Sequence, residues 1–177
     1  MSLHETVLQA QLDSLRKCKR MGEGAFAQLR DEDFFSRLHS EQCSIYAYMK
    51  HLAGNMRSRF TDFLTSDGEK PDRDRESEFV EERVPREQIM AMWEDGWRIV
   101  FAALESLRPG DLERTVTIRN EPHSVILAIT RQVAHYSYHV GQIMLLAKHI
   151  KRSRGEAWSY LTIAPGGSKA FNKSMGV

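Results

Sequence analysis

The chain has 177 residues, of which 41% are hydrophobic and 28% charged, and its formal net charge is +1. This length suits one domain with a single apolar core, so we expect residues 1–177 to form one domain. The nearly balanced charge provides no general attraction to nucleic acid or to an anionic membrane surface. We therefore expect neither as a partner.

The two cysteines, Cys18 and Cys43, lie far apart and form no CxxC pair. They predict reduced thiols, not a disulfide framework or a zinc knuckle. The N-terminal segment carries charges without an apolar run, which is unlike a signal peptide. The longest stretch without Asp, Glu, Lys or Arg, residues 132–147, is shorter than the ~20 apolar residues of a membrane-spanning helix. These features together predict a cytoplasmic protein.

Apolar residues recur at helical spacing in four stretches, of which the first two occupy residues 3–29 and 44–64. Gly22 and Gly24 weaken the first pattern near its end. The second pattern is a regular series of i, i+3 and i+4 steps, made by Ile45, Tyr48, Met49, Leu52, Met56, Phe60 and Phe63.

The third helical stretch begins after Pro85, which suits the first turn of a helix, and ends before Pro109. The fourth occupies residues 124–150. Four amphipathic helices with connections of moderate length predict an all-α fold, a four-helix bundle.

Two connections have a distinct character. Residues 65–83 are long and highly charged, and we expect them to form a solvated loop. Residues 115–119 favour an extended conformation, but the segment is short and we expect no sheet there.

His135 and His139 stand at i and i+4 on the fourth helix, so both imidazoles lie on one face, one turn apart. This is the geometry that two side chains need to bind one metal ion. Tyr136 occupies the position of the glutamate in an HExxH motif, so the sequence gives no support to a zincin protease. For the pair alone, two partly buried, hydrogen-bonded histidines in a bundle core are the favoured interpretation.

The angular positions of the histidines favour a site. At roughly 100° per residue, His135 and His139 lie about 85–125° from the centre of their apolar stripe, and His51 lies about 120° from its own. That position is the border between core and solvent. Asn55 and Arg59 follow His51 at i+4 and i+8 and extend a polar line toward the core, where such groups need polar partners. The alternative is a capped or salt-bridged helix surface.

Three histidine ligands would leave coordination positions open, as in catalytic or substrate-binding sites. Neutral imidazoles favour zinc or nickel, with iron or manganese as further candidates. The other histidines show no partner spacing and are interpreted as ordinary surface or core residues: His4, His39, His123 and His149.

Three segments resemble the DinB-like superfamily, and more narrowly its DUF1572 branch of uncharacterised bacterial proteins. They are KHLAGNMRSRFTDFL, DGEKPDRDRESEF and RQVAHYSYHVGQI. The resemblance covers residues 44–158 and implies a four-helix bundle with up-down-down-up connections. It also implies a metal site with three histidines, which correspond here to His51, His135 and His139.

Relatives in this superfamily include S-transferases that depend on bacillithiol or mycothiol, and a mycothiol-dependent maleylpyruvate isomerase. The resemblance therefore implies a metal-bound thiolate, and a homodimer, since many relatives are dimeric. Low-molecular-weight thiols of this kind carry carboxylates, which arginine binds through paired hydrogen bonds. Candidate substrate-binding residues are Asn55, Arg59, Arg73, Arg119 and Arg131. Structural salt bridges with nearby acids are the favoured alternative for any single arginine.

The leading hypothesis is thus a metal- and thiol-dependent S-transferase that acts on small electrophiles. One alternative is a non-catalytic metal-binding module, in which the metal chiefly stabilises the bundle. A second alternative is a metal-dependent hydrolase, although the sequence offers no evident second general base.

Overall fold

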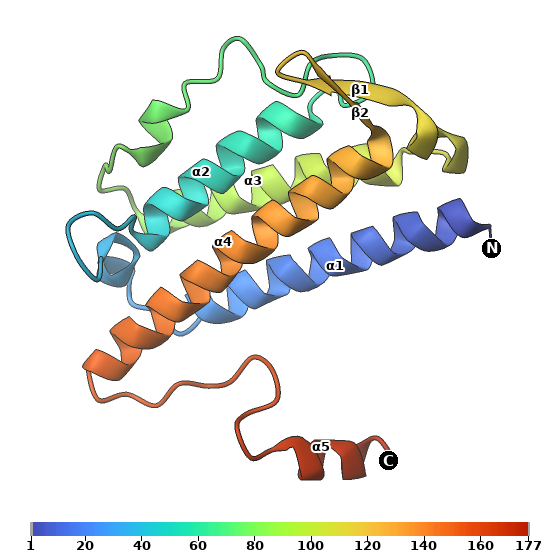
Figure 1. Cartoon of the computed structure of the whole chain (residues 1–177). Helices are drawn as coiled ribbons and strands as arrows, with labels where there is room; N and C mark the ends of the chain where they lie inside the picture. The colour runs from blue at the N-terminus through green and yellow to red at the C-terminus, as the bar shows by residue number, and fades with distance from the viewer. Residues whose placement is uncertain (1, 177) are drawn as a thin grey trace.

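The computed structural model describes residues 2–176 and consists mainly of helices (Figure 1). The four predicted helices are α1 (Leu3–Phe26), α2 (Ile45–Phe60), α3 (Arg86–Glu105) and α4 (Val125–Ser153). The shorter elements are η1 (Asp31–Phe35), η2 (Glu76–Phe79), η3 (Pro109–Glu113), β1 (Thr115–Ile118), β2 (Glu121–Ser124) and α5 (Ser168–Ser174).

Serine caps begin three of the long helices. Ser2, Ser44 and Ser124 each accept a hydrogen bond from a backbone N–H in the first turn, at 3.2, 3.1 and 3.3 Å respectively. Pro85 precedes α3, as predicted. Each helix therefore starts where its local sequence supplies an acceptor or a preset backbone angle.

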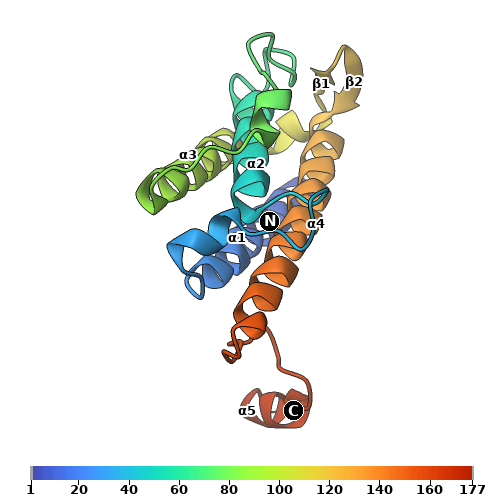
Figure 2. The ribbon, with the colours of Figure 1, turned by 90° about the vertical axis from the view of Figure 1, so that its left-hand side faces the viewer.

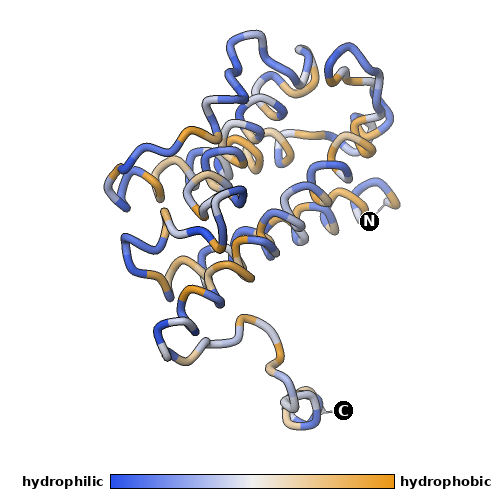
Figure 3. Tube along the Cα trace, turned by 60° about the vertical axis from the view of Figure 1, so that its left-hand side comes forward, coloured by the Kyte–Doolittle hydropathy of each residue, from blue (hydrophilic) through white to orange (hydrophobic). Residues whose placement is uncertain are grey.

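The helices pack in two pairs, α2 against α3 and α1 against α4. The first and fourth run in one direction and the second and third in the other, so residues 61–85 cross the length of the molecule (Figure 1). Figure 3 shows hydrophobic and hydrophilic residues alternating along the long helices, whereas this crossing segment is mainly hydrophilic. The apolar faces meet in the interior.

The core is rich in aromatic residues. Trp93 and Trp97 are fully buried, with ring centroids 5.5 Å apart at an interplanar angle of 71°. Trp97 also contacts the fully buried ring of Tyr136, whose hydroxyl donates to Asn55 Oδ1 at 3.1 Å. Both tryptophans therefore belong to the core. Both cysteines are free thiols, also as predicted.

The first two helices end earlier than predicted. The first helix ends at Phe26 instead of residue 29. The second ends at Phe60 instead of residue 64, because Thr61 is extended and Asp62 has a left-handed backbone (φ 50°). The fourth continues to Ser153, three residues beyond the predicted end. In the first two helices the apolar periodicity continues beyond the last helical residue, so it does not show where the backbone leaves the helix.

The prediction that residues 115–119 form no sheet is wrong. β1 and β2 form an antiparallel hairpin in which Thr115 pairs with Ser124 and Ile118 with Glu121. Arg119 and Asn120 make the turn with φ values of 56° and 61°. Two left-handed central residues are typical of a type I′ turn, and asparagine tolerates that conformation.

The charged segment of residues 65–83 also departs from the solvated loop that we predicted. It contains η2, it buries Glu78, and its Arg73 side chain is only 5% exposed. By contrast, α5 has no buried residue, and Figure 2 shows it apart from the long helices. Among the described helices, none is long and apolar enough to cross a bilayer.

Candidate metal centre

The structure brings His51, His135 and His139 together from two helices. His51 comes from α2 and the other two from α4, where the i, i+4 spacing places them one turn apart. The Nε2 atoms of His51 and His135 lie 3.3 Å apart, and one nitrogen of each histidine lies within 4.8 Å of the others. Two nitrogens bound tetrahedrally to one zinc ion at 2.0–2.1 Å would be roughly 3.3 Å apart. The cluster therefore fits a single metal ion.

The environment keeps two of these imidazoles neutral. Burial, followed by the positive charges of His139 and His51, lowers the pKa of His135 to about 3. Burial likewise lowers the pKa of His139 to about 4. Both rings are consequently deprotonated at neutral pH, which is the form that binds a metal.

Hydrogen bonds at Nδ1 orient two of the rings. His51 Nδ1 lies 2.8 Å from Glu78 Oε2, and His139 Nδ1 lies 2.8 Å from Gln142 Oε1. Both contacts leave Nε2 free to face the cluster. A carboxylate behind a metal-binding histidine fixes the tautomer and increases the basicity of the ring. Neither Glu78 nor Gln142 was predicted from the sequence to contact a histidine.

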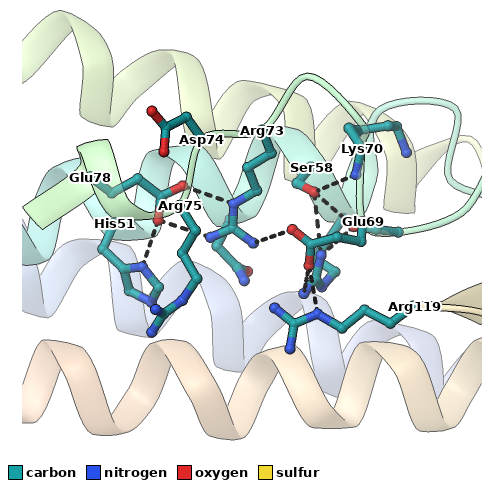
Figure 4. A network of polar contacts seen from close by, with 12 residues as sticks. His51, Ser58, Glu69, Lys70, Arg73, Asp74, Arg75, Glu78 and Arg119 are labelled. Carbon is teal, nitrogen blue, oxygen red and sulfur yellow. Dashed lines mark hydrogen bonds and ion pairs between the residues drawn. The ribbon is translucent and has the colours of Figure 1, made fainter.

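Glu78 is itself held in place by Arg73 (Figure 4). Arg73 Nε donates to Oε1 at 2.8 Å and its Nη2 donates to Oε2 at 2.9 Å, while the two side chains are 5% and 6% exposed. Burial alone would raise the pKa of Glu78, but the hydrogen bonds from His51 and Arg73 outweigh it and leave the pKa below its ordinary value. Glu78 is therefore a carboxylate, shared between one arginine and one candidate ligand.

The polar network continues from Arg73 to the hairpin (Figure 4). Glu69 accepts from Arg59 Nη2 at 2.9 Å, from Arg119 Nε at 3.0 Å and from Arg73 Nη1 at 3.4 Å. Asp67 accepts from the backbone N–H groups of Arg119 and Asn120 at 2.8 and 2.9 Å. The salt-bridge alternative thus holds for three of the candidate arginines, and these salt bridges join the crossing segment to α2 and to the hairpin.

A cavity of about 420 Å³ adjoins the histidine cluster. All five residues that the sequence suggested for substrate binding line it together with the three histidines. The lining residues are His51, Asn55, Arg59, Arg73, Arg75, Arg119, Arg131, Gln132, Ala134, His135, Tyr138 and His139. Ligand pockets for small molecules have volumes in the range of about 300–1,000 Å³.

Fold and site together define a mainly helical protein with a three-histidine cluster compatible with metal binding. A family described as "Protein of unknown function (DUF1572)" matches residues 2–167, and the chain belongs to this family. No curated protein and no solved structure matches the chain.

Proposed function

We propose that the chain binds one divalent metal ion through His51, His135 and His139, and that it acts as a metal- and thiol-dependent S-transferase on small electrophiles. The observation that carries this proposal is the convergence of three imidazoles beside a cavity of about 420 Å³. The metal, when bound, would lower the pKa of a thiol and hold the thiolate next to the electrophile. Zinc or nickel suits this donor set best, followed by iron or manganese.

A substrate-binding metal is favoured over a purely structural one by the number of ligands. Within residues 2–176, the cluster contains three histidines and no fourth His, Cys, Asp or Glu. Structural zinc sites fill all four positions with protein ligands, whereas catalytic sites keep one open. Here the cavity lies beside the histidines, so an open position would be accessible to a small molecule.

Thiol transfer is favoured over hydrolysis by the lining of the cavity. Among the described residues that line it, none is Asp or Glu, and Glu78 is committed to His51 and Arg73. A hydrolase needs a group that takes the proton of the attacking water, or a metal-bound hydroxide. A thiol is already acidic enough to lose its proton at a metal without such a base.

The remaining expectations are proposals as well. We infer a DinB-like bundle with up-down-down-up connections, a view supported by the helix pairing and directions in Figure 1. We also propose a cytoplasmic homodimer that acts on small molecules and not on nucleic acid or membranes. Apolar side chains exposed on α4 support a dimer, namely Leu127, Tyr138 and Leu145, which are 53%, 55% and 65% exposed.

Metal content tests the proposal directly. The protein is purified without added metal and without an affinity tag, and elemental analysis compares it with His135→Ala and His149→Ala. His149 is an exposed histidine on the same helix, so it serves as the matched control. We expect about one equivalent of metal in the wild type and in His149→Ala, and a loss in His135→Ala. Failure of the wild type to retain or take up zinc or nickel would overturn the proposal.

A second measurement separates the enzyme from the non-catalytic module. The cobalt-substituted protein is titrated with a small thiol while its absorption spectrum is recorded. A new sulfur-to-cobalt charge-transfer band would support a thiol at the metal. A loaded protein whose spectrum does not change with thiol would favour the module, in which the ion stabilises the fold.

A further inference from the structure

A row of polar residues on α2 lines the cavity from one side. His51, Asn55 and Arg59 follow one another at intervals of four residues, slightly more than one helical turn, so they lie along one face. All three are buried, with exposures of 5%, 5% and 6%. The row begins with a candidate metal ligand and ends with a guanidinium group about two turns away.

A matching row on α4 faces it. Arg131, His135 and His139 follow at the same interval and line the same cavity. The two helices run in opposite directions (Figure 1), so the histidines gather toward one end of the cavity, and Arg59 and Arg131 lie toward the other. The cavity thus has a metal-binding end and a cationic end, with Arg131 about one helical turn from His135 and Arg59 about two turns from His51.

The cationic end has more positive charge than its neighbours compensate. Five arginines line the cavity, and none of the described lining residues is acidic. Arg73 is paired chiefly with Glu78, whereas Arg59 and Arg119 share the single carboxylate of Glu69. The side chain of Arg131 has His123 Nε2, at 3.3 Å, as its hydrogen-bond partner within the described residues, and no carboxylate. A cavity of this kind attracts a negatively charged ligand.

Buried polar atoms without partners lie at the same end. Gln132 is 3% exposed and its Oε1 has no hydrogen bond among the described residues. The same holds for Nε of Arg59. Buried polar groups in folded proteins are nearly always hydrogen-bonded, so each exception needs an explanation. Both side chains line the cavity, where a ligand carboxylate can accept from Arg59 Nε–H and from the amide NH2 group of Gln132, while Oε1 of Gln132 requires a donor group.

We propose that the cavity binds one small ligand with two anchoring groups, a carboxylate at the arginine end and a metal-binding donor atom at the histidine end. This inference rests on the metal site proposed above. Arg131 binds the carboxylate, because its planar guanidinium matches a carboxylate through paired hydrogen bonds and no acid competes for it. Because Arg131 lies four residues from His135 on α4, the two anchoring groups of the ligand are separated by roughly 6 Å.

Matched thiols test the two-anchor ligand. The full-length protein is loaded with cobalt, and its spectrum is followed during titration with 3-mercaptopropionate or with 3-mercapto-1-propanol, which lacks the carboxylate. We expect the carboxylate to tighten binding by about tenfold to a hundredfold, the range for one charge-assisted hydrogen-bonded pair. Arg131→Gln should remove most of this preference. Arg152→Gln should keep it, since Arg152 is an exposed arginine of α4 outside the cavity.

The outcomes separate the two proposals. Equal affinity for the two thiols in the loaded protein would overturn the two-anchor ligand and leave the metal site standing. Absence of cobalt uptake would overturn the metal site, and the ligand proposal with it. Competition with propionate and with inorganic phosphate identifies the anion. Displacement of 3-mercaptopropionate by propionate supports a carboxylate site, whereas stronger displacement by phosphate would assign the arginines to a phosphate and overturn the carboxylate.

Discussion

Glu78 lies directly against the backbone of Gly54, so that a Cβ atom at Gly54 would come 2.8 Å from Glu78 Cδ. The missing side chain on α2 is what allows this carboxylate to reach His51, one turn earlier on the same helix. A glycine in the middle of a helix costs about 1 kcal/mol relative to alanine. At Gly54 this loss of helix stability leaves room for Glu78, which hydrogen-bonds to the candidate metal ligand His51.

Gly54→Ala should therefore weaken metal binding. The new methyl group displaces Glu78. Loss of a carboxylate that hydrogen-bonds to a metal-binding histidine typically lowers metal affinity by about tenfold to a hundredfold. Competition with a coloured chelator measures the affinity. Gly141→Ala is the control, because a Cβ there meets nothing within 4 Å. It should raise stability by about 0.5–1 kcal/mol and leave the affinity unchanged. Wild-type affinity in Gly54→Ala would show that the position of Glu78 is unimportant.

Glu78→Gln should destabilise the metal-free protein. The change keeps the shape of the side chain but leaves the charge of Arg73, which is 5% exposed, with only the longer contact to Glu69 at 3.4 Å. Removing one partner of a buried ion pair costs about 3 kcal/mol or more. Urea unfolding of the metal-free protein measures the change.

A double-mutant cycle supplies the control for this prediction. Arg73→Met combined with Glu78→Gln removes both charges, so the double variant should be more stable than Glu78→Gln alone. Additive effects of the two substitutions would mean that the pair is not coupled in solution.

The sequence supported the prediction of the helices and of the three histidines, because both depend on local periodicity. His135 and His139 are one turn apart on any helix, and a border position for His51 follows from its own apolar stripe. The partners of the histidines do not follow in this way. Glu78 is one of several acids in a charged segment, and nothing near it in sequence distinguishes it. Its role depends on the path of that segment over Gly54, which is a tertiary feature.

The hairpin was missed for a related reason. Each strand has four residues, too few for alternation to be recognised, and the turn consists of Arg119 and Asn120 without the glycine usual for a type I′ turn. A residue from a distant part of the chain stabilises the turn, because Asp67 accepts hydrogen bonds from the backbone N–H groups of both Arg119 and Asn120.

Asp67 should make stability depend on pH. Burial raises its pKa, but hydrogen bonds from the backbone of Glu69, Asn120 and Arg119 outweigh this, and the pKa lies well below its ordinary value of about 4. A carboxylate with a lowered folded-state pKa contributes stability above its unfolded pKa, and this contribution is lost as the pH falls toward the folded pKa. Asp67→Asn should thus be less stable than the wild type at pH 7, and the difference should shrink below about pH 4.

Urea unfolding at a series of pH values measures this effect. Asp72→Asn is the matched control, because Asp72 is exposed and makes no hydrogen bond or ion pair among the described residues. It should follow the wild type at every pH. A difference between Asp67→Asn and the wild type that stays constant down to pH 3 would exclude Asp67 as the titrating group.

Gln132→Met should raise stability while weakening ligand binding. Gln132 is 3% exposed and its Oε1 has no partner among the described residues, and an unsatisfied buried polar group costs about 1–3 kcal/mol. Methionine has a similar length and no such group, so we expect a gain of about 1 kcal/mol in urea unfolding. Gln28→Met should have the opposite sign, because Gln28 accepts from Ser159 N at 2.8 Å and from Lys151 Nζ at 3.1 Å. If Gln132→Met gains stability and loses affinity for 3-mercaptopropionate, whose carboxylate can accept from the amide NH2 group, Gln132 is retained for the ligand at the expense of the fold. A loss of stability would instead mean that the amide already has a partner in solution, and it could no longer support the proposed ligand site.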